Sequence, residues 1–75
     1  NLSMRRVYEY MLVTLMPHLG DELSVGEIQG CLNKYGEVGW ELVSIIENKT
    51  FRQELFQKVE RSSGYKFFFK RLSEE

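Results

Sequence analysis

The 75-residue sequence has few of the residues that small proteins use for cross-links or catalysis: it contains one cysteine, one proline and one histidine. A single cysteine excludes an intramolecular disulfide and is typical of a reducing compartment. His18 has no companions at metal-ligand spacing, and no glycine-rich phosphate loop is present. We therefore expect no metal, no cofactor and no enzymatic activity, and we interpret Cys31 as a core residue.

Long apolar runs and a strong excess of one charge are also absent. No segment is long enough to span a bilayer and no signal-peptide pattern is visible, which favours a cytoplasmic protein that does not bind membranes. The formal net charge is −1, so no overall basic field attracts nucleic acid. Residues 1–3 are interpreted as a cloning remnant and residues 4–73 as a single small domain.

Aromatic residues, by contrast, are abundant at 13%. Together with β-branched residues they predict three strands, at residues 5–16, 39–47 and 64–72. The first and second of these strands are separated by the only proline, Pro17, and by a stretch with helical periodicity.

That stretch begins at Ser24, which forms a candidate capping box with Glu27. Gly36 suits a left-handed residue just past the helix end. The helix is predicted to bury the apolar positions that recur along it: Val25, Ile28, Cys31, Leu32 and Tyr35.

Segment 48–63, between the second and third strands, is long for a hairpin loop. Phe51, Leu55 and Val59 recur at helical spacing, so we predict a short amphipathic helix here. This helix would either bind a partner or cap one end of the core. An extended hairpin is the alternative.

These elements predict an α+β fold with the order β-α-β-(short α or extended hairpin)-β. A helical crossover makes the first two strands parallel, and the third strand fits between them, antiparallel to both. We therefore expect a three-stranded sheet in the order 1-3-2, with one helix packed on one face.

Each expected strand has one face without charges and one face where charges alternate with apolar residues. Because a buried charge is costly unless it is paired, the uncharged faces are expected to lie under the helix. Those faces carry Tyr8, Tyr10, Leu12, Trp40, Leu42, Ile46, Phe67 and Phe69.

The opposite face of the sheet is expected to be an exposed interface. Its expected members are Met11, Val13, Val43, Ile45 and Phe68, surrounded by Glu9, Glu41, Lys66 and Lys70. We expect the lysines to pair with glutamates on the neighbouring strands. An exposed apolar patch of this kind is typical of an interaction surface.

Three segments resemble a known family: VYEYMLVTL near the start, LNKYGEVGWELVS in the middle and FFFKR near the end. The family consists of small bacterial and phage domains of unknown function with the pattern (W/Y)EYKVV, LNxLGxEGWELV and FKR. The resemblance implies a β-α-β-β fold. It implies no activity, because a fold does not determine a function.

These observations favour a non-enzymatic protein-interaction module. We predict a homodimer formed through the outer sheet face, because a patch with an apolar centre and mixed charges can be self-complementary. The same face, or residues 50–61, can alternatively bind a different protein. The family resemblance suggests a phage-type modulator of a host protein as one such case.

A nucleic-acid or nucleotide binder is the alternative class of function. Arg5, Arg6, Lys70 and Arg71 can form a basic edge. The segment GYKFFFK is similar to the aromatic strand of an RNA-recognition motif, in which exposed aromatic rings stack on bases. Since Tyr65, Phe67 and Phe69 are expected under the helix, the protein-interaction hypothesis is preferred.

Overall fold

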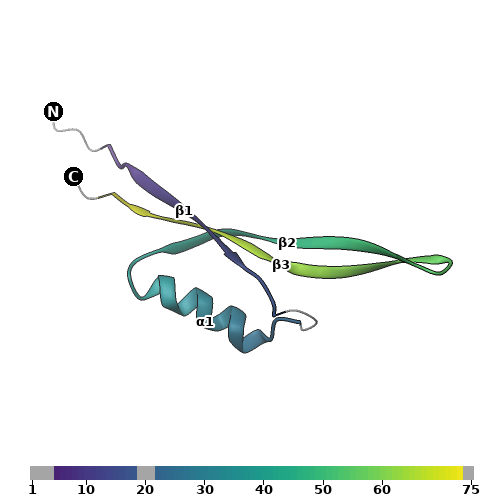
Figure 1. The fold of residues 1–75 in the computed structure, drawn as a ribbon. Coiled ribbons are helices and arrows are strands. Elements are labelled where there is room, and N and C mark those ends of the chain that lie inside the picture. The colour runs from purple at the N-terminus through teal and green to yellow at the C-terminus, as the bar shows by residue number, and fades with distance from the viewer. Residues whose placement is uncertain (1–4, 19–21, 74–75) are drawn as a thin grey trace.

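The computed structural model describes residues 5–18 and 22–73. Its elements, in chain order, are strand β1 (Tyr8–Leu15), helix α1 (Val25–Gly36), strand β2 (Glu41–Glu54) and strand β3 (Gln57–Leu72) (Figure 1). Residues 1–3, interpreted above as a cloning remnant, lie outside the described residues.

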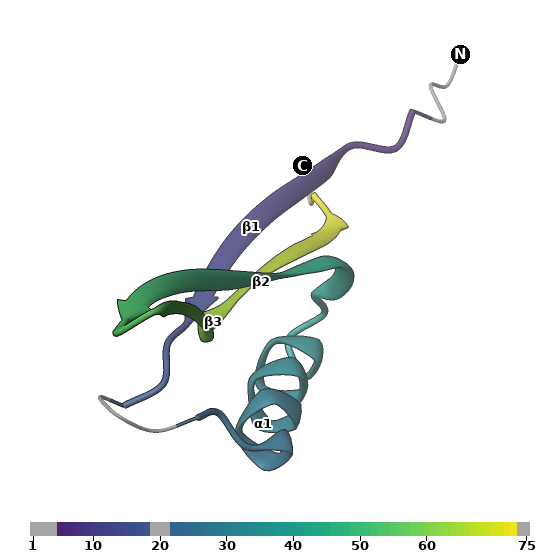
Figure 2. The ribbon, with the colours of Figure 1, turned by 90° about the vertical axis from the view of Figure 1, so that its right-hand side faces the viewer.

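β3 is the central strand of the sheet, and β1 and β2 pair with its two edges in antiparallel orientation. β1 and β2 therefore run parallel to each other, as strands joined by a helical crossover do. Helix α1 lies along one face of the sheet, and no other element of the described chain covers the opposite face (Figure 2). The predicted α+β fold and the strand order 1-3-2 are confirmed.

Helix α1 begins with the predicted capping box. The backbone N–H of Glu27 donates to Ser24 Oγ at 3.1 Å, and the backbone N–H of Ser24 donates to Glu27 Oε1 at 3.4 Å. Of the predicted apolar stripe, Ile28, Cys31, Leu32 and Tyr35 are half-buried. Val25, in the first turn, is 83% exposed.

The helix ends differently from the prediction. Gly36 is still helical, and the left-handed residue is Gly39, with φ +94°. The reason is the turn that leads into β2, in which Trp40 N–H donates to the Tyr35 carbonyl at 3.0 Å. In this turn the residue with positive φ is Gly39, three residues after the predicted position at Gly36.

Residues 48–63 form an extended hairpin, so the predicted short helix is wrong and the alternative is confirmed. β2 and β3 are already paired next to the helix, and cross-strand hydrogen bonds continue along both strands to the Glu54–Gln57 pair. A short isolated helix would have had to nucleate separately, without a surface to pack on. Phe51, Leu55 and Val59 consequently lie on β2, in the turn and on β3, and share no helical face.

The core lies between α1 and β3. Phe67 and Phe69 are the only described hydrophobic residues that are fully buried, and the Phe69 ring lies 5.3 Å from the Tyr35 ring, centroid to centroid. Directly opposite these rings on β1 lie Val13 and Met11. Because paired residues point to the same side of a sheet, β1 places Met11 and Val13 under the helix.

The prediction for the faces of β1 is therefore wrong: Tyr8, Tyr10 and Leu12 point away from α1. It rested on the rule that a face with a charge is exposed. Glu9 breaks this rule, because it lies on the helix side of the sheet opposite Arg71 and forms an ion pair with it. Side chains alternate along a strand, so placing Glu9 on the helix side also places Met11 and Val13 there. One paired glutamate therefore reverses the assignment of both faces of β1.

A β-bulge changes the alternation in β2. The register shifts between Leu42 and Ser44, so that Leu42 pairs with Phe69 and Ile45 with Phe67 on the helix side. Ile46 then pairs with Lys66 on the outer side. The predicted positions of Ile45 and Ile46 are thus exchanged, because a bulge adds one residue to the strand.

The hairpin extends well beyond the rest of the domain, and we call residues 48–63 the arm. β1 ends opposite Tyr65, so the arm contains two strands only. The molecule measures 67 × 22 × 14 Å, with the arm forming one end (Figure 1). Gly64, which is buried, marks the junction between the arm and the three-stranded sheet, which we call the body.

Gly64 is predicted to be essential for this junction. Its φ is +111°, and a Cβ at this position would collide with the carbonyl oxygen of Leu15. Gly64→Ala should lower the free energy of unfolding by about 2–4 kcal/mol, through backbone strain and overpacking together. Urea unfolding followed by circular dichroism measures this change.

Gly30→Ala is the matched control. A Cβ at Gly30 meets nothing within 4 Å, and alanine is a better helix former by about 1 kcal/mol. This variant should therefore be more stable than the wild type. Equal stabilities for Gly64→Ala and the wild type would contradict the described close approach of β1 to the junction.

Candidate functional site

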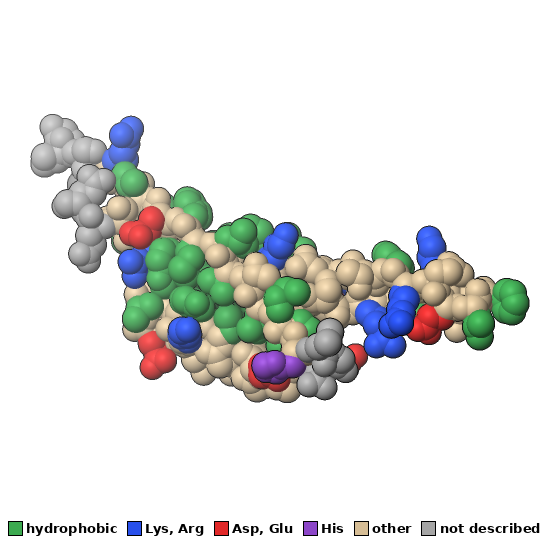
Figure 3. All heavy atoms as spheres, in the orientation of Figure 1, with side chains coloured by type: hydrophobic (Ala, Val, Ile, Leu, Met, Phe, Trp, Pro, Cys, Tyr) green, Lys and Arg blue, Asp and Glu red, His purple; other side chains and the backbone are tan. Residues whose placement is uncertain are grey.

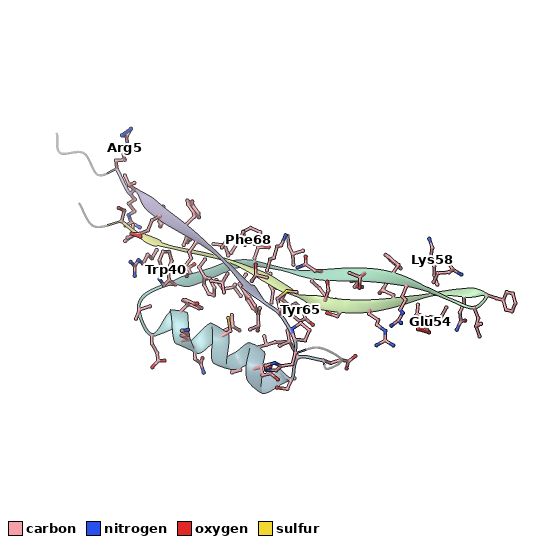
Figure 4. The ribbon with its side chains drawn as sticks, in the orientation of Figure 1. Arg5, Trp40, Glu54, Lys58, Tyr65 and Phe68 are labelled. Carbon is pink, nitrogen blue, oxygen red and sulfur yellow. The ribbon has the colours of Figure 1, made fainter. Side chains whose placement is uncertain are left out.

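The candidate site is the sheet face that points away from α1, which we call the outer face. From the strand register, its members are Tyr8, Tyr10, Leu12 and Thr14 on β1, Lys66, Phe68, Lys70 and Leu72 on β3, and Glu41, Ser44 and Ile46 on β2. Figure 4 shows Phe68 on this side of the sheet and Trp40 on the side of α1.

An apolar patch occupies the centre of the outer face. Leu12 and Ser44 lie directly opposite Phe68 on the two neighbouring strands. Tyr10 is 70% exposed, Leu12 55% and Ile46 49%, while Phe68 is half-buried between its neighbours. Hydrophobic side chains are gathered over the body, and charged side chains lie along the arm (Figure 3). We call Tyr10, Leu12, Ile46 and Phe68 the outer patch.

The structure brings together only part of the predicted interface. Four of its residues lie on the outer face: Glu41, Lys66, Phe68 and Lys70. Four others lie on the helix side: Glu9, Met11, Val13 and Ile45. Val43 lies at the bulge and is 54% exposed. Whether these residues form an interface remains a prediction.

The residues missed from the sequence are Tyr8, Tyr10, Leu12 and Ile46. One signal could have identified the three on β1. If Glu9 is paired with Arg71 across antiparallel strands, the register follows, and Phe68 falls opposite Leu12. No comparable signal marks the bulge that turns Ile46 outward, because nothing in the residues around Val43 distinguishes an irregular strand from a regular one.

The charges of the outer face are arranged differently from the expected lysine–glutamate ladder. Lys70 lies opposite Glu41, but its Nζ is placed 4.8 Å from the centre of the Tyr8 ring. Among the described residues, no ion pair joins Lys66 or Lys70 to a glutamate. The two lysines thus place positive charge beside exposed aromatic rings, an arrangement that allows cation–π contacts.

Arg71, on the helix side, holds three segments together. Its guanidinium lies 4.2 Å from the centre of the Trp40 ring, and its Nη1 donates to the Val38 carbonyl at 3.1 Å. Its Nε is 3.6 Å from Glu9 Oε1. The start of β1, the loop after α1 and the end of β3 therefore meet at one side chain. Arg71 is committed to these contacts, which weakens its predicted role in a basic edge.

The contacts of Arg71 should contribute unequally to stability. The ion pair with Glu9 is partly exposed, so Glu9→Gln should lower the free energy of unfolding by about 0.5 kcal/mol or less. Arg71→Ala removes the stacking on Trp40 and the hydrogen bond to Val38 as well, and should lower it by about 1–2 kcal/mol.

Arg71→Lys completes this series, because lysine keeps the charge but not the planar fork. Its stability should lie between those of the wild type and Arg71→Ala. Chemical denaturation of all three variants measures their free energies of unfolding. A loss for Glu9→Gln as large as that for Arg71→Ala would mean that the ion pair, and not the stacking, dominates.

The arm carries a second exposed apolar group at its tip. Leu55 and Phe56 form the two-residue turn between the paired residues Glu54 and Gln57, and they are 91% and 99% exposed. Leu55 has φ 46°, in the left-handed region. Only the first central residue of this turn has a positive φ, and a two-residue hairpin turn of this kind normally carries glycine at that position. Figure 3 shows hydrophobic side chains at this far end of the arm.

Along the shaft of the arm, which consists of its two paired strands, exposed ion pairs are found in place of buried side chains. Lys49 Nζ lies 3.1 Å from Glu60 Oε1 on the opposite strand, and Glu60 raises the pKa of Lys49 through this hydrogen-bonded contact. Arg52 Nε lies 3.9 Å from Glu54 Oε2. Exposed pairs of this kind contribute little to stability, so the arm has few interactions that fix it in place.

A catalytic arrangement is not evident in the described part of the chain. Burial raises the pKa of the Cys31 thiol, and the nearby Lys34 opposes this shift only partly. The reactive thiolate is therefore disfavoured at neutral pH. Among residues 5–18 and 22–73, no cluster of histidine, cysteine and acidic residues could hold a metal ion, and no helix could cross a membrane.

The fold and the outer face define a small α+β domain whose sheet is covered by a helix on one face only. The chain belongs to the family described as Domain of unknown function (DUF4177), which it matches over residues 8–71. This range runs from the start of β1 almost to the end of β3 and includes the arm. No curated protein and no solved structure matches the chain.

Proposed function

We propose that the protein is a non-enzymatic interaction module that self-associates through its outer face. One observation carries this proposal: among the described residues, only Phe67 and Phe69 are fully buried hydrophobic residues, whereas the apolar outer patch has no cover. A chain of this length has a small core even when it is well packed. Burial of the outer patch against another chain would supply the missing apolar contacts.

The size of the exposed surface supports a partner. A folded monomer of 8.9 kDa exposes about 4,800 Å². This chain exposes 6328 Å², an excess of about 1,500 Å². A standard protein interface buries about 800 Å² on each partner. The excess reflects the elongated shape of the chain, with its uncovered arm and outer face, and this shape leaves room for an interface of that size.

A second copy of the same chain is the partner that we propose. A twofold interface requires a surface that is complementary to itself. The outer face carries an apolar centre with Lys66 and Lys70 on β3 and Glu41 on β2, so that both signs of charge surround the patch. Opposite charges on the rim can then pair between copies, while the apolar centre of each face is buried against the other copy.

Phe68→Asp tests the proposal, with the solution mass measured by light scattering over a range of concentrations. The wild type should be a dimer, and Phe68→Asp should be a folded monomer, because a charge in the middle of the interface would be buried without a partner. Tyr10→Asp, at a position that is 70% exposed, should have the same effect with less risk to the fold.

Val25→Asp is the matched control, since Val25 is 83% exposed at the start of α1, away from the outer face. This variant should remain a dimer. A wild type that is monomeric at all concentrations would contradict the proposal. So would Phe68→Asp and Tyr10→Asp variants that are folded and still dimeric.

A second candidate function is binding of single-stranded nucleic acid, and one observation favours it. The aromatic residues that lie on the exposed face are Tyr8, Tyr10 and Phe68, and Lys66 and Lys70 lie among them. Exposed rings next to basic residues are the usual platform for stacking bases. The net charge of −1 argues against this function, because it provides little electrostatic attraction.

Fluorescence anisotropy with a labelled single-stranded RNA distinguishes this candidate. If it is correct, Tyr10→Ala and Lys66→Ala weaken binding, and the affinity falls with salt with a logarithmic slope of about −1.4 for two phosphate contacts. Lys34→Ala, on α1, should leave the affinity unchanged. An absence of binding at low salt would reject the candidate.

A further inference from the structure

The arm offers a specific way to cover the outer patch. We propose that the tip of the arm, Leu55 and Phe56, packs on the outer patch of a second copy, and that the two copies exchange arms reciprocally. This inference rests on the proposed self-association and names the segment that carries it. Each arm would then lie antiparallel to the arm of its partner.

The tip has the properties of a buried contact without a visible partner. Phe56 is 99% exposed, more than any other large hydrophobic residue of the described chain, and Leu55 is 91% exposed. Leu55 also adopts φ 46°, which a residue with a branched side chain rarely does. A leucine at a position that favours glycine lowers the stability of an isolated hairpin, and the exposed apolar tip is explained if it is covered in the assembly.

The dimensions of the hairpin suit a reciprocal arrangement. Phe56 precedes Phe68 by twelve positions, which corresponds to about 40 Å along the hairpin. The midpoint of the same stretch lies close to the Thr50–Arg61 pair. A twofold axis through this pair would place each tip near the outer patch of the other copy. Ile46 and Phe68 of the outer patch lie on the two strands that the tip connects, so one axis relates both contacts.

The middle of the arm is suited to lie against a copy of itself. Phe51, next to the proposed axis, is 62% exposed. Lys49 and Glu60, which form an ion pair on the same face of the arm as Phe51, provide both signs of charge there, so antiparallel arms can bring opposite charges together. A two-stranded ribbon is only marginally stable alone, and packing against a second ribbon would stabilise it.

The double variant Leu55→Gly/Phe56→Asn removes the apolar tip and improves the turn. Glycine at position 55 adopts the observed positive φ without strain, so the arm should stay folded. The dissociation constant of the dimer should rise by at least about 30-fold, the effect of losing one interface hot spot. The control Val25→Ser removes a similarly exposed apolar side chain from α1 and should leave the dissociation constant unchanged.

Cysteine cross-linking tests the contact itself, in a Cys31→Ser background. Phe56→Cys protein is mixed in turn with Tyr10→Cys, Leu12→Cys and Ile46→Cys protein and oxidised. At least one mixture should give a disulfide-linked heterodimer, because one of the three positions of the outer patch should lie within disulfide distance of the tip. Phe56→Cys mixed with Gln29→Cys, on α1, should not.

The outcomes separate this inference from the proposed function. If Phe68→Asp is monomeric, the tip variant dimerises with unchanged affinity and Phe68→Cys cross-links to itself, the outer faces pack directly on each other and the arm exchange is wrong. If the wild type is monomeric, both proposals fail. Monomeric Phe68→Asp, a weakened tip variant and a tip-to-patch disulfide would together support both.

Discussion

The burial of two rings of β3 beneath α1 is the interaction on which the fold depends. Phe67 and Phe69 are next-nearest neighbours on the central strand, and their rings lie 6.2 Å apart. Tyr35 of helix α1 contacts Phe69, and β1 and β2 flank the two rings with Val13, Met11, Leu42 and Ile45. Every element therefore packs around one short stretch of the chain. Because side chains alternate along a strand, burial of these two rings also directs Phe68 to the opposite face.

This constraint explains why the outer face is apolar and yet uncovered. The central strand carries three consecutive phenylalanines, and a single helix can cover only one side of the sheet. On the helix side, Arg71 stacks on Trp40 next to the core. The aromatic residues of the body therefore fall into two sets, one on the helix side and one on the exposed outer face. A β-sheet with one uncovered apolar face normally packs against another layer. The domain has no such layer among its described residues, which is why a second chain is the natural candidate.

Much of the fold could be predicted from the sequence, because it depends on local signals. Ser24 and Glu27 indicate the start of the helix, and the crossover then determines the direction of the strands and the place of β3. The faces of the strands could not be predicted in the same way. They depend on register, which a single ion pair between Glu9 and Arg71 and a single bulge near Val43 decide. The extended arm was ambiguous, since the spacing of its apolar residues fits a helix equally well.

The arm is the part of the chain in which local preference and observed structure disagree most. In natural proteins the local sequence usually favours the structure that the segment adopts, and exceptions tend to occur at functional positions. At its tip, two bulky apolar residues replace turn-forming residues, and at its shaft exposed ion pairs replace burial. Neither feature stabilises a monomer. Both features are expected of a hairpin that is stabilised by a binding partner, and this is the basis for proposing that the arm and the outer patch form one interface.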